Sequence, residues 1–300
     1  MRHPLDEKGM DAAPGRIRCL VAPNPSAMTG PGTNTFLLGS GEVVVIDPGP
    51  DDPAHLRAIV GALDPGEQIA AILVTHPHLD HSALAPALAR ATAAGVFGFG
   101  APGSGWDARM RALAALDPGG GEGRDTGFRP DRRLKGGEVL RLGEVTLQVL
   151  ATPGHMAEHL AFGWGRTLFV GDLVMAWAPS LVSLPDGDMG DYLASLARVA
   201  AGPWRRLLPA HGAPITAPRT RIAEVIAHRQ AREAQILAAL RAGPATLAAI
   251  VARVYPDIAP GLCEAARRSA LAHLVDLAGR GLVAAAPRPA PDAVFRRRDA

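Results

Sequence analysis

The sequence has 300 residues, of which 48% are apolar, so it is long enough for one large domain or two ordinary ones. The formal net charge of +2 gives no overall field typical of proteins that bind nucleic acids or membranes. The charge is uneven, however, with −4 over residues 1–218 and +6 over residues 219–300. This asymmetry predicts two modules, 1–218 and 219–300, the second of which could meet an anionic partner.

The two cysteines, Cys19 and Cys263, lie far apart and indicate a reducing compartment rather than a disulfide framework. The first residues include Asp6 and Glu7 and lack the apolar segment of a secretory signal. No run approaches the roughly 20 apolar residues that a membrane helix needs. We therefore expect a cytoplasmic protein with no membrane partner.

Residues 1–16 show no regular pattern and are expected to be flexible, and an extended segment begins at Ile17. A Gly-rich stretch at residues 28–33 then leads into an apolar strand. Neither a helix nor a Lys-Ser/Thr pair follows it, so it predicts a turn into a hairpin rather than a nucleotide-binding loop.

A β-α-β unit is predicted next. Residues 42–46 form an apolar strand that ends in Asp47, residues 53–63 form a helix, and residues 69–75 form a second apolar strand. Asp47 should therefore leave the sheet at the same edge as the residues after the second strand. It is expected either to orient a metal ligand there or to cap a turn or helix.

Four metal-binding side chains follow the second strand within six residues, in the order His76-Pro77-His78-Leu79-Asp80-His81. They lie between a buried strand and a helix predicted at residues 82–92, and open α/β sheets bind their ligands at such strand ends. Imidazole suits zinc and other divalent transition metals, and a nearby carboxylate adds an oxygen ligand. This concentration of ligands favours a metal site over a polar loop that is rich in histidine by chance.

A short strand at residues 95–100 precedes a long Gly-, Pro- and Arg-rich stretch at residues 101–135, which has little periodicity. A loop of this length within a compact domain is usually functional or disordered. Its arginines and aromatic residues could line a substrate cleft, with a solvated loop as the alternative: Trp106, Arg109, Arg111, Arg124, Phe128 and Arg129.

Three further strands end in an ionisable residue. Strands at residues 138–140 and 145–150 precede His155, a hairpin at residues 160–164 and 167–170 precedes Asp172, and an apolar segment from Arg206 precedes His211. A helix at residues 188–199 lies between the last two. A single histidine of this kind is usually structural, but four such strand ends in one chain predict a shared site at one edge of the fold.

With these residues the chain resembles the metallo-β-lactamase-fold hydrolases over residues 17–215. The matching segments are His76–His81, Thr152-Pro153-Gly154-His155, Gly171-Asp172 and Pro209-Ala210-His211-Gly212. The resemblance implies an α/β fold, a four-layer αβ/βα sandwich, with a small C-terminal domain. Gly32-Thr33-Asn34-Thr35 and the C-terminal extension are most similar to the β-lactamase-like protein 2 group, whose better-studied members act as endoribonucleases.

The resemblance also implies two zinc ions, with manganese or iron as alternatives. His76, His78 and His155 would hold one ion, Asp80, His81 and His211 the other, and Asp172 would bridge them. Two divalent ions about 3.5–4 Å apart generate hydroxide from the water between them and clamp the attacking and leaving oxygens. Asp80 could also act as the catalytic base that orients this bridging hydroxide.

Several other residues acquire expected roles through the resemblance. His78 stands where the di-iron redox branch has Glu, which favours hydrolysis over electron transfer. Asp47, Asn34 and His159 are candidates to orient a ligand or contact the substrate, with a structural role for His159 as the alternative. Ser82 stands where many relatives have Gly, which could narrow the approach to the second ion.

The C-terminal module predicts a winged-helix-like unit. Helices are expected at residues 219–240, 245–254 and 262–277, followed by a short strand after Gly279. The last helix would enter the DNA groove in a helix-turn-helix protein, but it carries too few basic residues to predict that use. The alternatives are a wall of the active-site cleft or a homodimer contact. The tail Arg296-Arg297-Arg298 is expected to be solvated and mobile.

The sequence thus predicts a dinuclear zinc hydrolase. Its substrate would be a phosphodiester, with single-stranded RNA as one candidate, or an ester-type bond. A thioesterase, lactonase or β-lactam-hydrolysing activity on a small molecule is the enzymatic alternative, because the same metal pair polarises a carbonyl. A metal-dependent binding or regulatory protein that acts through its winged-helix-like domain is the alternative of another class.

Overall fold

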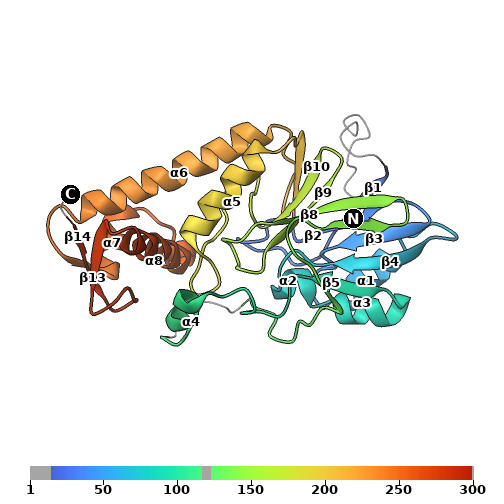
Figure 1. The fold of residues 1–300 in the computed structure, drawn as a ribbon, viewed down its shortest axis with the longest axis horizontal. Helices are drawn as coiled ribbons and strands as arrows, with labels where there is room; N and C mark the ends of the chain where they lie inside the picture. The colour runs from blue at the N-terminus through green and yellow to red at the C-terminus, as the bar shows by residue number, and fades with distance from the viewer. Residues whose placement is uncertain (1–14, 117–122, 299–300) are drawn as a thin grey trace.

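The computed structural model describes residues 15–116 and 123–298, so the expectation for residues 1–14 lies outside the described part of the chain. Two β-sheets pack face to face, and a helical module lies at the far end of the molecule from the first sheet (Figure 1). Among the described residues, none of the helices combines the length and apolar character needed to cross a membrane.

The first sheet has six strands in sequential order: β1 (Ile17–Val21), β2 (Asn34–Leu38), β3 (Glu42–Ile46), β4 (Gln68–Leu73), β5 (Gly95–Gly98) and β6 (Arg132–Arg133). The first three pair antiparallel, and β3 to β6 pair parallel. Helix α1 (Pro53–Val60) connects β3 to β4, as the predicted β-α-β unit requires, and α3 (Ala85–Thr92) leads from β4 to β5.

The second sheet has the order β11-β10-β9-β8-β7: β7 (Val139–Leu142), β8 (Val145–Ala151), β9 (Leu160–Trp164), β10 (Thr167–Gly171) and β11 (Arg206–Pro209). Its strands pair antiparallel except β10 and β11, which are parallel and joined through α5 (Met189–Ala201). Parallel neighbours need such a crossover, because a tight turn cannot return the chain to the same end.

Alternation of side chains along the strands builds the four layers. In β2, Phe36 and Leu38 pack between the two sheets against residues such as Phe169, whereas Leu37 packs outward with Ile59 of α1. Successive residues of a strand point to opposite faces, so a strand that is apolar throughout must be covered on both sides. The predicted αβ/βα sandwich is confirmed.

The C-terminal module is a winged-helix unit, as predicted. It contains α6 (Pro218–Ala239), α7 (Leu247–Val254), the 3₁₀ turn Pro260–Leu262, α8 (Cys263–Gly279) and a three-stranded sheet of β12 (Ala245–Thr246), β13 (Val283–Ala286) and β14 (Val294–Arg297). One apolar cluster runs without interruption from Leu168 in β10, through Leu196 in α5, to Phe295 in β14. The module is therefore packed firmly onto the second sheet.

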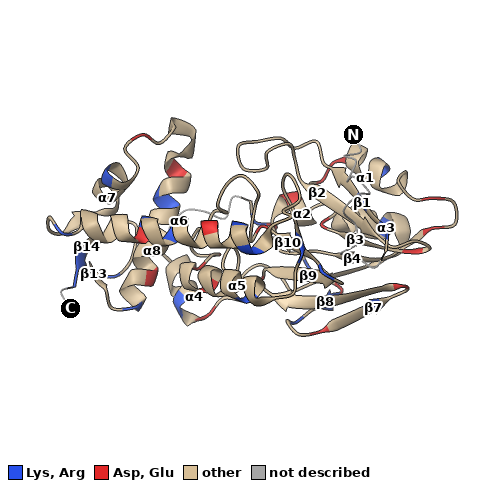
Figure 2. Cartoon of the chain, turned by 90° about the horizontal axis from the view of Figure 1, so that it is seen from above, with Lys and Arg blue, Asp and Glu red and all other residues tan. Residues whose placement is uncertain are grey.

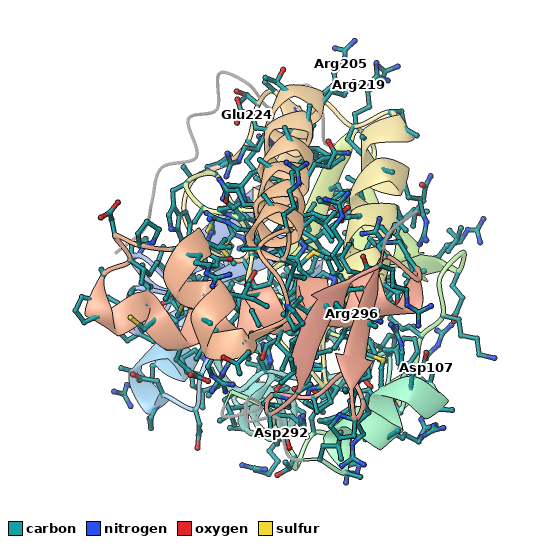
Figure 3. The ribbon with its side chains drawn as sticks, turned by 90° about the vertical axis from the view of Figure 1, so that its left-hand side faces the viewer. Asp107, Arg205, Arg219, Glu224, Asp292 and Arg296 are labelled. Atoms are coloured by element: carbon teal, nitrogen blue, oxygen red, sulfur yellow. The ribbon has the colours of Figure 1, made fainter. Side chains whose placement is uncertain are left out.

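Three local expectations are wrong. The tail belongs to a strand, because Arg296 (labelled in Figure 3) and Arg297 lie in β14 and pair with β13. The fully buried Phe295 anchors that strand, while the side chains of Arg296 and Arg298 are exposed, as expected. The stretch 101–135 contains a helix, α4 (Ala108–Ala114), whose first turn is capped by Asp107. The helix expected at residues 82–92 begins earlier, as α2 (Leu79–Ser82), and breaks before α3.

Candidate metal centre

The predicted ligands lie on loops that leave the two sheets at one edge. The segment His76–His81 follows β4 and extends into α2, His155 follows β8, Asp172 follows β10 and His211 follows β11. These loops come from both sheets, so the four strand ends meet only because the sheets are stacked. The structure brings all seven side chains together.

The first group consists of three histidines. Nδ1 of His78 lies 2.9 Å from Nε2 of His76 and 3.1 Å from Nε2 of His155. The ligand atoms of the three lie within 4.8 Å of one another. Three ring nitrogens that face a common point are the arrangement that a divalent cation requires on one side of its coordination sphere.

The second group combines a carboxylate with two histidines. Oδ2 of Asp80 lies 3.4 Å from Nε2 of His81 and 3.3 Å from Nε2 of His211. Their ligand atoms also lie within 4.8 Å of one another. Asp80 and His81 both belong to α2, whose short turn directs their side chains to the same place.

Asp172 lies between the two groups. Its Oδ1 is 3.3 Å from Nε2 of His211 and 3.6 Å from Nε2 of His81, and its Oδ2 is 3.7 Å from Nε2 of His155. One carboxylate oxygen thus faces each group. This geometry matches the bridging position that the resemblance implies for Asp172.

Outer contacts fix the orientation of the histidine rings. Nδ1 of His155 lies 2.7 Å from the carbonyl oxygen of Leu181, and Nδ1 of His211 lies 3.3 Å from that of Gly32. A carbonyl can only accept, so each Nδ1 donates its proton and Nε2 is the ring nitrogen that faces the cluster. A ligating histidine needs this tautomer, which its second ring nitrogen determines.

The residues fit a pair of divalent metal ions. Nε2 of His81 and Oδ1 of Asp172 are buried and have no hydrogen-bond partner among the described residues, although both point into the cluster. Buried polar atoms without a partner are costly, and a cation would satisfy both. The donor set of imidazole and carboxylate suits zinc, iron or manganese.

The protonation states agree with metal ligation in the first group. Burial and the neighbouring His155 lower the pKa of His78 to about 3, and burial with His81 and His78 holds the pKa of His76 well below its usual range. Both rings are therefore neutral at pH 7, which leaves their lone pairs available to a metal.

In the second group the carboxylates determine the protonation states. Burial tends to lower the pKa of His211, but the charge of Asp172 and the close contacts of Nε2 with Asp172 and Asp80 outweigh it and raise that pKa to about 9, so metal binding at His211 requires the release of a proton from Nε2. At Asp172 burial would raise the pKa, but the positive charges of His211 and His81 hold it well below its ordinary value. Both carboxylates are ionised and able to bind cations.

Asp47 contacts a predicted ligand directly. Its Oδ2 lies 3.0 Å from Nδ1 of His81, and its two oxygens accept from the backbone N–H and the hydroxyl of Thr75 at 2.8 Å. It also adopts a left-handed backbone with φ of 51°, uncommon for a residue other than glycine. Of the two expectations for Asp47, this position corresponds to the orienting one, because the helix cap of α1 is Asp52.

Asn34 and His159 form hydrogen bonds with the loops that carry predicted ligands, and neither residue lines the cavity described below. The Asn34 amide donates to the carbonyls of Pro209 and Gly212, which flank His211, at 3.0 and 2.9 Å. Nε2 of His159 accepts the backbone N–H of Asp172 at 3.1 Å. His159 is fully buried, so it lies beyond the reach of a substrate and corresponds to the structural alternative.

A cavity of about 260 Å³ opens onto the two metal-binding groups. Apart from the predicted ligands its described lining is Met28, Thr29, Gly123, Met175, Leu181, Ser183, Asp186 and Arg268. Arg268 belongs to α8, so the winged-helix module contributes one wall of the cavity, as one of the alternatives for that module required. The sequence patterns gave no indication of Asp186 or of the three apolar residues.

The six residues that were predicted as cleft candidates in the stretch 101–135 do not line this cavity. Phe128 is 3% exposed and packs in the core beneath α3, and Arg109 pairs with Asp188 at the start of α5. Arg124 lies just behind the cavity wall, because it pairs with the cavity residue Asp186 at 2.7 Å. Its guanidinium also stacks on the ring of Trp106.

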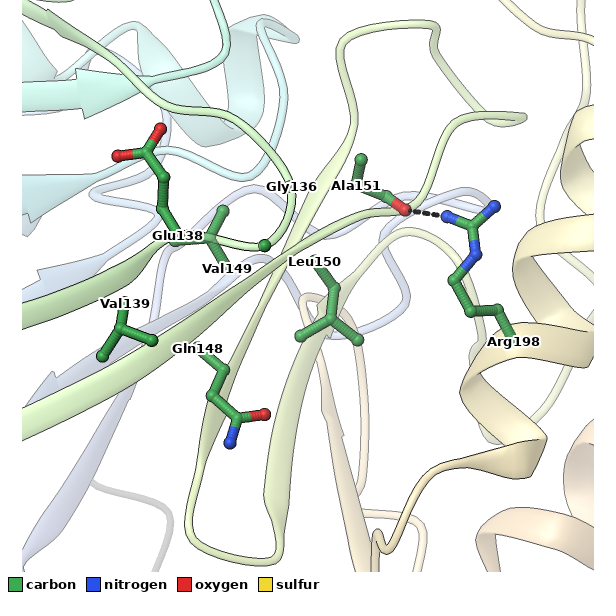
Figure 4. Close-up of a pocket in the computed structure, with 9 residues that line it drawn as sticks. Gly136, Glu138, Val139, Gln148, Val149, Leu150, Ala151 and Arg198 are labelled. Atoms are coloured by element: carbon green, nitrogen blue, oxygen red, sulfur yellow. Dashed lines mark hydrogen bonds between the residues drawn. The ribbon is translucent and has the colours of Figure 1, made fainter.

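A larger depression, of about 490 Å³, lies between β7, β8 and α5 (Figure 4). Arg198 of α5 lies at one end of it and donates to the carbonyl of Ala151 (Figure 4). None of the predicted ligands lines it, so the chemistry that those ligands could support belongs to the smaller cavity.

Comparison with known proteins supports both modules. Residues 28–211 match the Metallo-beta-lactamase superfamily, and residues 246–288 match the Beta-lactamase associated winged helix domain. A metallo-beta-lactamase family protein from Thermus thermophilus superposes with a TM-score of 0.75 at 27% identity, covering 94% of this chain and 98% of the other. A second structure, solved in a di-iron-bound form, has a TM-score of 0.51 at 29% identity and covers 67% of this chain and 95% of the other.

Three curated relatives illustrate the range of similar proteins. A "Beta-lactamase-like protein 2 homolog" from Drosophila melanogaster is 32% identical over 71% of this chain and 70% of its own length. The lactamase-like protein aptB from Emericella nidulans is 30% identical over 81% and 74%. An "Atrochrysone carboxyl ACP thioesterase" from Aspergillus fumigatus is 28% identical over 77% and 67%. The chain spans about two thirds of the length of several fungal relatives.

Proposed function

The chain belongs to the metallo-beta-lactamase superfamily, and from that membership we propose that it is a dinuclear metal hydrolase acting on a small acyl substrate, a thioester or an ester. His76, His78 and His155 would hold one ion, and Asp80, His81 and His211 the other. Asp172, with one oxygen facing each group, is the single observation that carries the dinuclear assignment.

When bound, such a pair of ions supplies hydroxide at neutral pH and polarises the carbonyl that is attacked. The chain's own residues hold and orient this chemistry. Oδ2 of Asp80 lies 3.3 Å from the hydroxyl of Thr33, which donates to it and restrains the carboxylate that we propose as catalytic base. Asp80 is the most accessible member of its group, with 27% of its side chain exposed against 0% and 2% for His81 and His211, so it is the one positioned to meet a substrate.

The lining of the cavity favours an acyl substrate over RNA. Met28, Met175 and Leu181 present apolar surface beside the metal groups, which suits an acyl chain. Proteins that bind single-stranded nucleic acid use a basic groove together with aromatic rings on which bases stack. Among the described residues the cavity lining has one arginine, and its only aromatic rings are the imidazoles of the predicted ligands His78, His155 and His211. The similar fungal thioesterase adds to the same preference.

The surface charge of the winged-helix module also favours an acyl substrate over RNA. Acidic residues are interspersed among the arginines of α6 and α8 (Figure 2), and Arg221, Arg267 and Arg280 each pair with a glutamate, which reduces the positive charge that a phosphate backbone would meet. On α8, Glu264 pairs with both Arg267 and Arg268. We therefore propose that the module shapes the substrate cavity, while phosphodiester hydrolysis stays the second candidate because a two-metal centre supports both reactions.

The metal is proposed to be zinc. Five histidines and two aspartates suit zinc, and the same set accommodates iron, which a similar protein holds as a di-iron centre. Reconstitution of the metal-free protein with each ion, followed by the assay below, identifies the ion that supports turnover.

A hydrolysis assay tests the proposal. The zinc-loaded protein is compared with His78→Ala and Asp80→Asn on acyl thioesters, nitrophenyl esters, a lactone, a β-lactam and single-stranded RNA. We expect thioester or ester turnover that each substitution lowers at least about 1,000-fold, because the removed group acts in the transition state. Preferential cleavage of RNA would replace the acyl proposal by the second candidate. No turnover of any compound by the fully loaded protein would contradict an enzymatic function.

A further inference from the structure

Every polar atom of Asp47 has a partner within the described chain. Its backbone N–H donates to the carbonyl of Leu73 at 2.9 Å, and its own carbonyl accepts from the hydroxyl of Thr35 at 2.7 Å. Its carboxylate accepts from Thr75 and lies 3.0 Å from Nδ1 of His81. A residue other than glycine keeps a φ of 51° only where its surroundings fix it, so these contacts hold Asp47 in one position.

Asp47 reaches one predicted ligand in each metal-binding group. His81 of the second group faces its Oδ2 directly. His76 of the first group is reached through Thr75, whose hydroxyl donates to Asp47 and therefore accepts from Nδ1 of His76, 3.1 Å away. Both histidines thus carry a hydrogen on Nδ1 and present Nε2 to the proposed ions. The position of Asp47 therefore sets the orientation of two ligands at once.

The hydroxyl of Thr35 fixes the direction of the next hydrogen bond. It has one hydrogen, which goes to the Asp47 carbonyl because a carbonyl can only accept. Nε2 of His55 lies 2.8 Å from the same hydroxyl oxygen, so His55 must be the donor there. Burial lowers the pKa of His55 and so favours the neutral ring, which carries a hydrogen on only one nitrogen. These contacts require the Nε2–H tautomer of His55.

Helix α1 presents His55 to this network. Asp52 caps the helix and accepts the backbone N–H of His55 at 3.1 Å, and His55 itself is 3% exposed. The imidazole lies against Gly49, where a Cβ atom would come within 3.1 Å of the ring. Gly49 in turn donates its backbone N–H to the carbonyl of His81 at 3.1 Å. One buried imidazole therefore contacts this segment through Thr35 and through Gly49, and both routes lead on to His81.

We propose that His55 is a positioning residue of the metal centre, which acts through the Thr35 hydroxyl on Asp47. Asp47 then orients one histidine of each metal-binding group. The inference rests on the proposed dinuclear function and extends it to a helix whose residues do not line the metal cavity. A histidine that only stabilised α1 in the core would affect folding stability without a separate effect on metal affinity.

The tautomer of His55 tests the direction of the network. Long-range proton–nitrogen NMR spectra of the metal-free 300-residue chain report which ring nitrogen carries the hydrogen. At neutral pH we expect the Nε2–H tautomer for the signal that disappears in His55→Leu. The Nδ1–H tautomer would overturn the inference, because Nε2 could not donate to Thr35. This measurement needs neither bound metal nor turnover, so its result stands apart from that of the hydrolysis assay.

Two pairs of substitutions separate loss of a hydrogen bond from loss of a side chain. His55→Leu and Thr35→Val remove the donor and the hydroxyl at similar size, and we expect each to lower zinc affinity about 10-fold, the lower end of the range for changes around metal ligands. His55→Gln and Thr35→Ser keep a donor and a hydroxyl and should restore most of the affinity. Competition with a chelating dye measures it. Wild-type zinc affinity in His55→Leu or in Thr35→Val would overturn the inference.

Ile59→Ala is the matched control for a general loosening of α1. Ile59 is fully buried on the same helix and has no part in these hydrogen bonds. Its substitution should lower the unfolding free energy and leave zinc affinity unchanged, whereas His55→Leu should lower both. An equal loss of affinity in the two variants, at a similar loss of unfolding free energy, would mean that His55 is only structural and would overturn the inference.

A double-mutant cycle tests whether His55 acts through Asp47. Once Asp47→Asn has removed the carboxylate that orients the ligands, His55→Leu should have little further effect on zinc affinity, because neighbouring residues of one network are not additive. Losses that multiply in the double variant would show that His55 does not act through Asp47 and would overturn the proposed route.

Discussion

Single residues around the predicted ligands determine how those ligands are presented. His81, His155 and His211 each direct Nδ1 to an oxygen, contributed by Asp47, Leu181 and Gly32 respectively. The Nε2 atoms consequently converge without any rearrangement. Such preorganisation explains why a metal centre tolerates changes at these outer positions poorly, although they touch neither metal nor substrate.

Asp47→Asn tests this outer layer. The amide can present an N–H to Nδ1 of His81, which disfavours the required tautomer, so we expect metal affinity or activity to fall about 10–100-fold. Zinc affinity measured by competition with a chelating dye checks this. Asp52→Asn is the control, since asparagine still caps α1 and should leave the affinity unchanged. Equal affinities for wild type and Asp47→Asn would contradict the orienting role.

The seven clustered residues could be predicted because each belongs to a segment that directly follows a buried strand, and in these segments the local pattern and the family resemblance agree. Arg268 and Asp186 could not be assigned to the cavity in this way. Their positions depend on how α8 and the loop before α5 pack against the first module, and no local periodicity encodes that contact. Ser82 was expected near the second ion, whereas its hydroxyl donates to His78 carbonyl and Asp125 carboxylate oxygens, on the supporting side of the turn.

Among the elements, α8 carries the most unusual buried group. His273 is fully buried and neither ring nitrogen has a hydrogen-bond partner among the described residues. Burial, with the positive charges of Arg229, Arg232, His228 and Arg280, lowers its pKa to about 3. The helix therefore contains a neutral imidazole that cannot be protonated in place at moderately acid pH.

The sign of the resulting pH effect is fixed by this shift. The folded pKa lies below the unfolded value of about 6.5, so protonation of the unfolded chain lowers folding stability as pH falls from 6.5 toward 3. Below pH 6.5 this group alone lowers the unfolding free energy by about 1.4 kcal/mol per pH unit. Between pH 7 and pH 5 we therefore expect the unfolding free energy of the wild type to fall by about 2 kcal/mol more than that of His273→Leu. Urea unfolding at both pH values measures this. Parallel pH dependences of the two proteins would exclude the assigned role of His273.

Helix α6 joins the modules through the buried Arg229, which donates to the carbonyl of Ser180, and its guanidinium also lies over the ring of Tyr192 at 5.4 Å. Arg229→Met would leave the Ser180 carbonyl without its donor, so we expect a loss of about 2–4 kcal/mol in unfolding free energy. We also expect a raised KM, because the loop at Leu181 relaxes. Thermal denaturation and steady-state kinetics check both effects.

Arg232→Met is the matched control for that substitution. Arg232 stacks on Tyr255 and donates to the Val254 carbonyl, on a face of α6 away from the cavity. It should cost about 1 kcal/mol or less and leave KM unchanged. Equal KM effects of the two substitutions would show that Arg229 has no special connection to the active-site loop.

Strand alternation and the β-α-β pattern predicted most of the two sheets, because apolar residues on both faces leave few other arrangements. Helix α4 was missed because it has only seven residues, and its two buried apolar side chains, Met110 and Leu113, are too few to show a helical repeat between Gly-rich segments. Strand β14 was missed because the three arginines at residues 296–298 suggested a solvated tail, although the preceding Phe295 is the buried residue that anchors the strand. Charge runs describe the exposed face of a strand and say little about the opposite face.

For the whole molecule, the two modules share one apolar cluster and one cavity. Leu196 of α5 and Ile222 of α6 belong to the same core as Leu274 of α8, so the winged helix cannot separate without exposing that core. The charge difference between residues 1–218 and 219–300 suggested two modules, and two different family models do match the two parts of the chain. The boundary at residue 218 stays a prediction, since α6 begins there and packs against both parts.

The metal content of the purified 300-residue chain tests the central claim most directly. After exhaustive dialysis against metal-free buffer and loading with zinc, we predict two tightly bound ions per chain by mass spectrometry. Asp172→Asn, which removes the carboxylate that faces both groups, should retain fewer than two. A wild-type protein that retains none, or an Asp172→Asn variant that still binds two ions with undiminished affinity, would contradict a shared dinuclear centre.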